Sequence, residues 1–373
     1  MGNFALNVPI NSVSYGAVSI GILREIYKRG LSPSVFCIVG GADLSAQKDD
    51  QDFNLWLQGC LNKSIKLHKR TDKVFKLWHL NSCLDSMSKF QGLYFFHETN
   101  QPTEEELNAV NNQDVCFVSS QYTKHVFEEY GVAADKIKYC PPGFDDWNFH
   151  KTNKEYLSKD TIVFQLCGKT ETRKATARIA GLWVKKFGND KKYRLHLAIY
   201  NPFFRRQDGQ QMSFEEQKAL FIHQVFGGKN YWNVNFYPFL QKNAEFNDFL
   251  NCSQIDLTGL SLSEGFNLPL FQSLCLGKWA VVLNAHVHKD YCNANNSILV
   301  EPSSMCPAVD NMFFRQGDRF NQGSWFQWDD EAVISGMELA CSKAHTPNVE
   351  GEKLREAFTF SRTVDIILAG LGI

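Results

Sequence analysis

Residues 257–284 read LTGLSLSEGFNLPLFQSLCLGKWAVVLN, and this stretch is the most direct indication of the fold class. It predicts the end of a strand, a turn at 263–265, a helix that opens at 267–269 and ends before Gly277, and a second strand at 279–284. A strand, a helix and a further strand in this order are typical of a parallel sheet covered by helices.

The same alternation continues along the rest of the chain. Short β-branched and aromatic runs predict a first series of strands at 34–40, 92–97, 114–120 and 137–140, and a second series at 161–168, 194–200, 234–239, 254–260, 279–284 and 297–301. Longer amphipathic stretches alternate with them, including predicted helices at 17–29 and 351–370. The sequence therefore predicts an α/β protein with two parallel sheets.

A segment rich in proline, glycine and charge, residues 140–160, lies between the two series and is typical of a linker. The length of 373 residues corresponds to two domains of about 150 residues or somewhat more. We expect a first domain at 1–150, a second domain at 151–350, and a C-terminal helix within 351–373. A return of that helix to the first domain is an open alternative.

The composition is that of a globular protein without a dominant charge. Lys and Arg total 39 and Asp and Glu total 40, so the net charge of -1 gives no global indication of a nucleic-acid or membrane partner. The 11 cysteines contain no CxxC pair, which favours free thiols in a reducing compartment. Neither a signal peptide nor an apolar run of the ~18 residues of a membrane span is found, so we expect a cytoplasmic protein.

The turn and helix within 257–284 have the chemistry of an anion site. Free backbone N–H groups and the positive end of the dipole at a helix start attract phosphate, and Gly265 lets a phosphate approach closely. Glu264, just before the helix, is placed to bind a hydroxyl group while the amides hold the phosphate. From the residues alone, a capped structural helix without a ligand is an equal alternative.

Other nucleotide and metal motifs are missing from the sequence. The run CGKT at 167–170 ends like a Walker A loop, but Val163 stands where that motif has its first glycine. No GxGxxG opens a helix after a strand, so a dinucleotide-dependent oxidoreductase has little support. His286, His288 and Cys292 lack the paired spacing of a zinc site, and no metal is expected.

Several stretches resemble the retaining GT-B glycosyltransferases of glycosyltransferase family four. The run SEGFNLPLFQSLCLGKWAVV at 263–282 is similar to that family's pattern of S-E-G-F-G-L-P, an acidic residue, A-M-A and G-K-P-V-V. Residues 93–145 resemble the end of its first domain, and residues 166–187 resemble the G-x-x-x-x-R-K opening of its second. The resemblance covers 90–300 and implies two facing Rossmann-like domains with parallel sheets and a cleft between them.

The resemblance implies a site for a nucleoside-diphosphate sugar, UDP- or GDP-linked, in the second domain. Arg173 and Lys174 match the basic pair that holds the donor diphosphate, and Glu264 matches the first Glu of the family's E-x7-E motif, which contacts the sugar. Gln272 replaces the second Glu and can hydrogen-bond ribose hydroxyls without a charge-assisted bond. The other expected donor-binding residues are Gly16, Gly168, Lys169, Ser263, Gly265, Phe266, Asn267 and Leu268.

In the first domain, the resemblance places His97 near the transferred sugar, and Glu98 and Thr99 become candidates for acceptor contacts. Gly16 matches a glycine loop that faces the diphosphate, although the usual Gly-Gly is here Tyr15-Gly16. From the residues alone, a histidine on an apolar strand indicates a core residue, and an Arg-Lys pair early in a helix indicates a solvated face. The expected catalytic residues are Arg173, Lys174, Glu264 and His97.

The reaction implied by the resemblance is sugar transfer with retention at the anomeric carbon. Retaining hydrolases use a carboxylate nucleophile, for which this family has no agreed equivalent. A front-face route, in which the departing phosphate helps to deprotonate the acceptor, fits the basic pair better. No metal and no cofactor are expected, because the Arg-Lys pair and helix N-termini supply the positive charge.

The acceptor has two interpretations from the sequence. A basic stripe at 63–76, with spacings of three and four, predicts one charged helical face; it contains Lys63, Lys66, Lys69, Arg70, Lys73 and Lys76. A solvated amphipathic helix is one interpretation. The other is a phosphate-binding surface for nucleic acid or anionic lipid, with Lys66, Lys69, Arg70 and Lys73 as acceptor residues and a hydroxymethylated DNA base as one acceptor.

The sequence thus predicts a glycosyltransferase that moves a sugar from a nucleoside-diphosphate sugar to an acceptor hydroxyl. Two alternatives remain open. A sugar-nucleotide epimerase shares the two-domain fold and would form product from the donor alone. A non-catalytic nucleotide-sugar-binding protein would bind the nucleotide without turnover. The replacement of the second motif Glu by Gln272 is compatible with this alternative.

Overall fold

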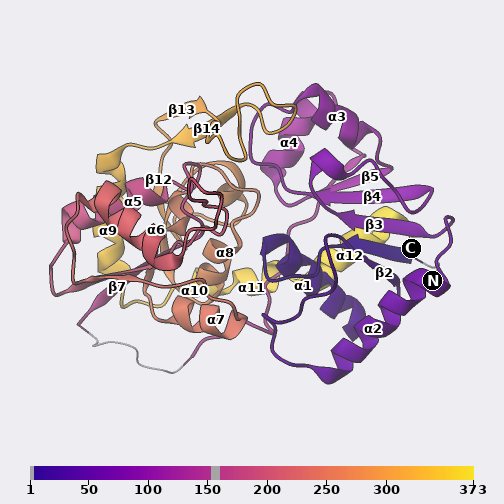
Figure 1. The fold of residues 1–373 in the computed structure, drawn as a ribbon, viewed down its shortest axis with the longest axis horizontal. Coiled ribbons are helices and arrows are strands. Elements are labelled where there is room, and N and C mark those ends of the chain that lie inside the picture. Colours follow the sequence, from indigo (N-terminus) through magenta and orange to yellow (C-terminus); the bar gives the residue numbers. More distant parts are fainter. Residues whose placement is uncertain (1–3, 153–159) are drawn as a thin grey trace. The chain divides into compact units, whose positions relative to one another are not determined.

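The computed structural model describes residues 4–152 and 160–373, which form two compact units (Figure 1). Unit 1 consists of Met1–Asn148, Phe313–Gly323 and Arg355–Ile373, and unit 2 consists of Phe149–Met312 and Ser324–Leu354. Residues 153–159 of the predicted linker lie outside the described part of the chain.

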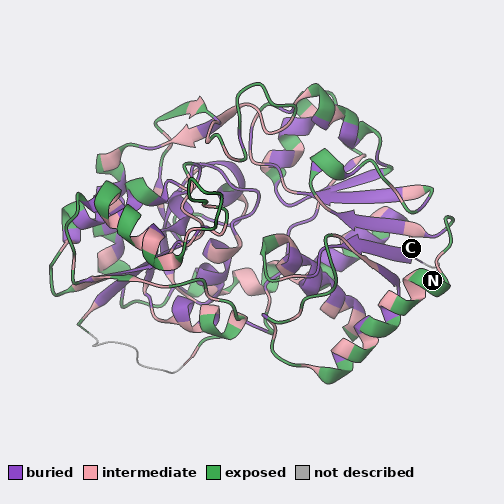
Figure 2. Ribbon diagram, in the orientation of Figure 1, coloured by how far each residue is buried: buried purple, intermediate pink, exposed green. Residues whose placement is uncertain are grey.

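Unit 1 is built on a six-stranded parallel sheet in the order β2-β1-β3-β4-β5-β6. Its strands are β1 (Phe4–Val8), β2 (Ser34–Cys37), β3 (Lys73–Leu77), β4 (Phe90–Phe95), β5 (Val115–Val118) and β6 (Ile137–Tyr139). The connections contain α1 (Ser14–Lys28), α2 (Gln51–Lys66), the 3₁₀ turn η1 (Leu80–Ser82), α3 (Glu104–Asn111) and α4 (Gln121–Glu129). Every residue of β1 and β5 is buried, as expected for parallel strands with both faces covered (Figure 2).

The C-terminal helix α12 (Phe360–Leu371) packs on α1 within unit 1, after the short α11 (Leu354–Ala357). Gly21 of α1 makes this contact close, because a Cβ there would lie 2.1 Å from the ring of Phe360. Arg29, at the end of α1, forms a 2.6 Å ion pair with Asp365. The last helix therefore completes the packing of the first unit.

Unit 2 contains a second six-stranded parallel sheet, in the order β12-β11-β10-β7-β8-β9. Its strands are β7 (Ile162–Cys167), β8 (Tyr193–Ala198), β9 (Val234–Phe236), β10 (Ile255–Asp256), β11 (Trp279–Leu283) and β12 (Ile298–Val300). The helices are α5 (Thr176–Phe187), α6 (Phe214–Phe226), α7 (Asn243–Asn251), η2 (Thr258–Leu260), α8 (Leu268–Cys275), η3 (His286–Asp290), α9 (Asp330–Lys343) and α10 (Val349–Glu352). An antiparallel pair, β13 (Ser304–Pro307) and β14 (Ser324–Gln327), completes the list.

The structure corrects the prediction of one basic helical face at 63–76. Helix α2 ends at Lys66, and the chain then re-enters the sheet as β3, between β1 and β4. Lys76 is buried in this strand with only 2% of its side chain exposed, and its Nζ pairs with Asp85 at 2.6 Å. The basic residues are therefore divided between a helix, a turn and a central strand.

Other expectations differ in detail. Strands β1 and β3 and the β13–β14 pair are additions to the predicted set, and the strand predicted at 254–260 is only two residues long before η2 begins. The segment Phe313–Gly323 falls in the range expected for the second domain but belongs to unit 1, where Asn321 N donates to Glu106 Oε1 at 2.9 Å.

All 11 cysteines are free thiols. Within the described ranges, no helix is both long and apolar enough to cross a membrane.

Candidate functional site

The charged residues expected to bind a diphosphate lie at the carboxyl edge of the unit-2 sheet. Arg173 and Lys174 belong to the turn between β7 and α5, and Glu264 belongs to the turn between η2 and α8. Because β7 and β10 are neighbouring parallel strands, the two turns leave the sheet at the same edge, which is where open α/β sheets bind ligands. The Arg-Lys pair precedes α5 and is not on a solvated helical face.

Glu264 is the centre of a buried ion-pair cluster. Its Oε2 accepts a hydrogen bond from Arg173 Nη1 at 2.8 Å, and its Oε1 accepts one from Lys174 Nζ at 2.6 Å. Only 6% of the Glu264 side chain and 7% of the Arg173 side chain are exposed. Burial alone would raise the pKa of Glu264, but the positive charges of Arg173 and Lys174 hold that pKa well below its usual range. Glu264 is therefore an anion with two fixed cations beside it.

A second carboxylate, from Glu171, extends this cluster and was not predicted. Its Oε2 lies 3.3 Å from Arg173 Nη2, and its Oε1 lies 2.7 Å from Lys169 Nζ. The position of Glu171, two residues before Arg173, was the sequence signal that could have suggested it. The full cluster has three cations and two carboxylates and so keeps an excess of positive charge. Its members are Lys169, Glu171, Arg173, Lys174 and Glu264.

Gly168, directly after β7, makes room for the Lys174 side chain. Its φ of 113° is in the region that favours glycine, and a Cβ at this position would lie 3.1 Å from Lys174 Cδ. A side chain here would therefore strain the backbone and displace the ammonium group from Glu264.

The amino end of α8 is held in place by the side chain of Asn267. This residue has a left-handed conformation, with φ 67° and ψ 61°, which Asn adopts more readily than most residues. Its Nδ2 donates hydrogen bonds to the carbonyl oxygen of Thr258 at 3.1 Å and to His288 Nε2 at 3.0 Å. Asn267 thus ties the start of the helix to η2 and η3, which lie on either side of β11 in the sequence.

These contacts determine the protonation state of His288. The carbonyl oxygen of Thr258 can only accept, so Nδ2 of Asn267 must be the donor on that side, and Nε2 of His288 must accept. The proton of His288 then lies on Nδ1, which donates to the carbonyl oxygen of Leu283 at 3.1 Å. Burial lowers the pKa of His288 to about 4, so the ring is neutral at physiological pH. No local pattern in the sequence predicts this pairing.

The remaining expected donor residues surround the same helix start. Tyr291 Oη donates to the carbonyl oxygen of Phe266 at 2.7 Å, and the two rings are in contact. Gln272 is buried on α8, and Leu268 is the first residue of that helix. Ser263, Gly265, Phe266 and Asn267 are all buried, and the Ser263 carbonyl oxygen accepts from Arg173 Nη1 at 2.6 Å. The residues expected in the second domain to bind the donor therefore lie either in the turn after β7 or within and just before α8.

His97, Glu98 and Thr99 follow β4 in unit 1. His97 is buried, its Nε2 lies 3.1 Å from Thr99 Oγ1, and its ring packs on Phe127. Burial lowers the pKa of His97 and keeps it neutral. This environment also fits the alternative of a satisfied core histidine.

Gly16 lies in the first turn of α1 and has a structural reason to be glycine. A Cβ at this position would lie 2.2 Å from the carbonyl oxygen of Asn11, so the loop after β1 could not approach the helix this closely with any other residue. The contact accounts for Gly16 without a ligand.

The residues expected to bind a polyanionic acceptor do not form one helical face. Lys66, Lys69 and Arg70 are exposed, but Lys69 and Arg70 precede β3 and so lie at the amino edge of the unit-1 sheet. The ammonium group of Lys73 donates to the carbonyl oxygens of Leu371 and Gly372, which end α12. The predicted acceptor stripe is therefore wrong as a helical surface.

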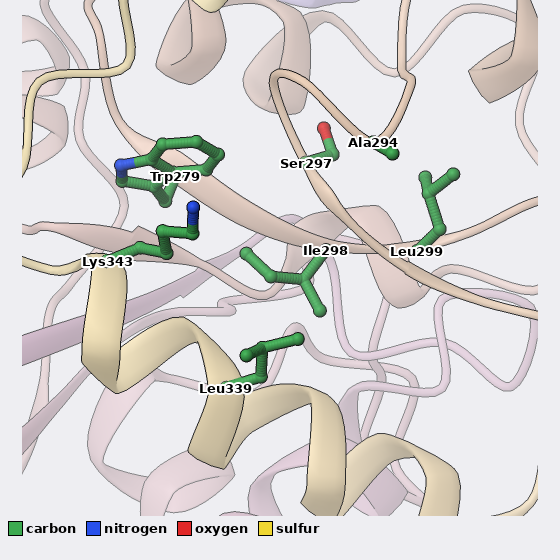
Figure 3. A pocket seen from close by; sticks show the side chains of 7 residues that line it. All are labelled: Trp279, Ala294, Ser297, Ile298, Leu299, Leu339 and Lys343. Atoms are coloured by element: carbon green, nitrogen blue, oxygen red, sulfur yellow. The ribbon is translucent and has the colours of Figure 1, made fainter.

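A separate pocket of about 260 Å³ lies on unit 2 and shares no residue with the charged cluster (Figure 3). It is lined by Trp279, Ala294, Ser297, Ile298, Leu299, Leu339 and Lys343.

In residues 4–152 and 160–373, no group of three or more His, Cys, Asp or Glu side chains is placed to hold a metal ion.

Two six-stranded parallel α/β units define the GT-B fold, and solved glycosyltransferase structures match it over the whole chain. Sucrose-phosphate synthase from Thermosynechococcus elongatus aligns with a TM-score of 0.68 and 12% identity over 98% of this chain and 97% of that one. HepE of Anabaena in complex with UDP-glucose has a TM-score of 0.62 and 14% identity over 99% of both chains. The catalytic domain of starch synthase IV from Arabidopsis thaliana, bound to ADP and acarbose, has a TM-score of 0.64 and 9% identity over 100% of both.

No family model and no curated protein sequence matches this chain. At these identities the structural likeness shows the GT-B fold.

Proposed function

We propose that this protein is a glycosyltransferase that transfers a sugar from a nucleoside-diphosphate sugar to an acceptor hydroxyl, with retention at the anomeric carbon. The observation that carries the proposal is the buried cluster of Arg173, Lys174 and Glu264 beside the amino end of α8. Structures with the same fold that hold UDP, UDP-glucose or ADP support a nucleotide-sugar donor. UDP and GDP are the nucleotides that we would test first.

In this proposal the cations of the cluster bind the diphosphate. A lysine ammonium has three donors and an arginine guanidinium has five, so Lys174 and Arg173 can contact phosphate oxygens while they remain paired with Glu264. The amides at the amino end of α8 add the positive end of a helix dipole. Together these groups stabilise the negative charge that develops on the leaving diphosphate.

Glu264 is suited to bind sugar hydroxyls and poorly suited to be a nucleophile. Both of its oxygens are held by cations, which lowers their nucleophilicity, while an ionised carboxylate still accepts strong hydrogen bonds. We therefore favour front-face departure for the retaining reaction. The bond between the anomeric carbon and the phosphate oxygen breaks, the acceptor oxygen bonds to the anomeric carbon on the same face, and the acceptor proton passes to the leaving phosphate oxygen. Lys169, Arg173 and Lys174 supply the positive charge, and the proposal uses no metal ion or cofactor.

The experiment that tests the proposal is a panel of UDP-, GDP- and ADP-sugars, measured by calorimetry and by release of the nucleotide. We expect one donor to bind and to be turned over, and Arg173→Lys and Glu264→Gln to lose that turnover. An epimerase would convert the donor to an isomer of the same mass without an acceptor. Binding without any turnover would support the non-catalytic alternative.

A further inference from the structure

Aromatic side chains gather at the carboxyl edge of the unit-1 sheet. Tyr15 lies in the first turn of α1, Trp78 and His79 directly follow β3, and Phe96 directly follows β4. The Tyr15 ring lies 4.3 Å from that of His79, 4.9 Å from that of Phe96 and 6.1 Å from that of Trp78, measured between centroids. Because β1, β3 and β4 are adjacent parallel strands, these rings form one cluster at the edge where α/β sheets bind ligands.

The cluster reaches solvent, unlike the rings of the strands behind it. Phe75 and Tyr94 are fully buried, whereas Tyr15, Trp78 and Phe96 are only half-buried and His79 is exposed. Ligand sites are typically lined by aromatic rings together with a small number of polar groups that fix orientation. Here the polar groups are Tyr15 Oη and His79 Nδ1, which lie 3.2 Å apart.

The charge of this edge distinguishes between classes of ligand. The segments that directly follow β1, β3 and β4, residues 9–13, 78–85 and 96–103, contain no Lys or Arg. Their charged residues are Asp85, which pairs with Lys76, and Glu98, whereas Lys89 directly precedes β4 at the opposite edge. Glu98 is two residues beyond Phe96 in the segment that follows β4. Burial and then the negative charge of Glu98 raise the pKa of Tyr15. A polyanionic ligand would be repelled here, and Lys69 and Arg70, which could attract it, lie at the opposite edge of the sheet.

We propose that the aromatic edge, defined as Tyr15, Trp78, His79, Phe96 and Glu98, binds a neutral carbohydrate as the acceptor. The inference rests on the proposed function and adds the substrate class. Aromatic rings pack against the apolar C–H face of a pyranose, and the carboxylate of Glu98 accepts hydrogen bonds from its hydroxyls. The same carboxylate disfavours phosphorylated or acidic acceptors and DNA.

Binding and transfer to neutral and anionic probes test this proposal. The neutral probes are maltose, cellobiose and lactose, and the anionic probes are a heparin fragment and a duplex with hydroxymethylated bases. Saturation-transfer NMR measures binding, and mass spectrometry measures transfer from UDP-, GDP- and ADP-glucose. We expect a neutral sugar to bind and to be glycosylated, with the heparin fragment and the duplex inactive.

Trp78 provides the residue-level test. Trp78→Ala should weaken sugar binding at least about tenfold, because a central aromatic contact is typically worth more than 1 kcal/mol, and Trp78→Phe should recover much of it. Trp232→Ala is the matched control, since Trp232 is 47% exposed on unit 2 and should leave sugar binding unchanged. Thermal unfolding confirms that each variant is folded.

The outcomes separate this inference from the proposed function. Sugar binding that depends on Trp78 supports the aromatic edge whether or not a donor is turned over. Release of nucleotide from a donor without binding of any neutral sugar, or transfer to heparin or DNA instead, overturns the inference and leaves the proposed function standing. Sugar binding that is the same in folded Trp78→Ala also overturns it.

Discussion

Replacing Lys174 with alanine removes one of the two cations that contact Glu264, and the structure predicts different effects on turnover and on stability. Lys174 Nζ lies 2.6 Å from Glu264 Oε1, and its side chain is only 14% exposed. Arg173 remains 2.8 Å from Glu264 Oε2, so the carboxylate keeps a charged partner after the substitution. The variant should therefore fold while losing much of its stabilisation of the leaving diphosphate.

The magnitudes follow from these contacts. Loss of one hydrogen bond to a charged group costs about 1.5–3 kcal/mol of folding free energy, which lowers the Tm by several °C. Loss of a fixed donor to a developing negative charge lowers kcat by about 10²–10³. Turnover should thus fall far more than stability, and the KM for the donor should rise less than kcat falls.

The assay is the rate of nucleotide release from the active sugar donor, measured beside thermal unfolding. Lys185→Ala is the matched control, because Lys185 lies on α5, is 64% exposed and pairs only at 3.5 Å with Glu331. That control should change the folding free energy by no more than about 0.5 kcal/mol and leave kcat unchanged. A folded Lys174→Ala variant with turnover close to wild type would refute the role given to the cluster.

Gln272→Glu should lower the KM for the donor by about fivefold, since a charge-assisted hydrogen bond to ribose is roughly twice as strong as a neutral one; an unchanged or higher KM would contradict this role of position 272. Gly168→Ala should reduce both Tm and turnover, because the new Cβ would displace Lys174. Gly209→Ala is the control: Gly209 has φ 82° and no atom within 4 Å of its Cβ, so this variant should lose only Tm. Equal turnover in the two variants would argue against the contact between Gly168 and Lys174. Burial lowers the pKa of His288 in the folded protein to about 4, whereas the ring titrates near 6.5 in the unfolded chain. Between these values the unfolded chain binds one proton more, so the free energy of unfolding should fall as the pH is lowered from 6.5 toward 4. Nitrogen NMR should show the proton of His288 on Nδ1; a proton on Nε2 would contradict the hydrogen bond from Asn267.

The helix start at α8 could be predicted because its signals are local. Gly265 and Pro269 occur at the spacing that a turn and a first helical turn require, and the structure begins the helix at Leu268. Strand β3 could not be predicted in the same way. Its lysines suggest an exposed helix. Only the fold shows that Lys76 is buried in the sheet and pairs with the exposed Asp85, and that Lys73 reaches carbonyl oxygens at the end of α12.

The candidate site could also be predicted only in part from local sequence. Arg173 and Glu264 could be named as candidates from motifs, yet 91 positions separate them in the chain. Their ion pair is visible only once β7 and β10 are neighbours. The link between Asn267 and His288 joins two loops on either side of β11 and depends on the tautomer of the imidazole. Local sequence patterns carry information about neither of these long-range contacts.

Calorimetric titration of UDP, GDP and ADP into wild-type protein and the Arg173→Lys variant measures whether the charged cluster binds a diphosphate. The Nη1 of Arg173 donates to Glu264 and to the Ser263 carbonyl oxygen, and its Nη2 donates to Glu171. A lysine, with one nitrogen, cannot reproduce this fork. We expect one nucleoside diphosphate to bind the wild type at a single site and the folded variant to bind it at least about tenfold more weakly. Failure of all three nucleotides to bind, or equal affinity in the two proteins, would contradict this expectation.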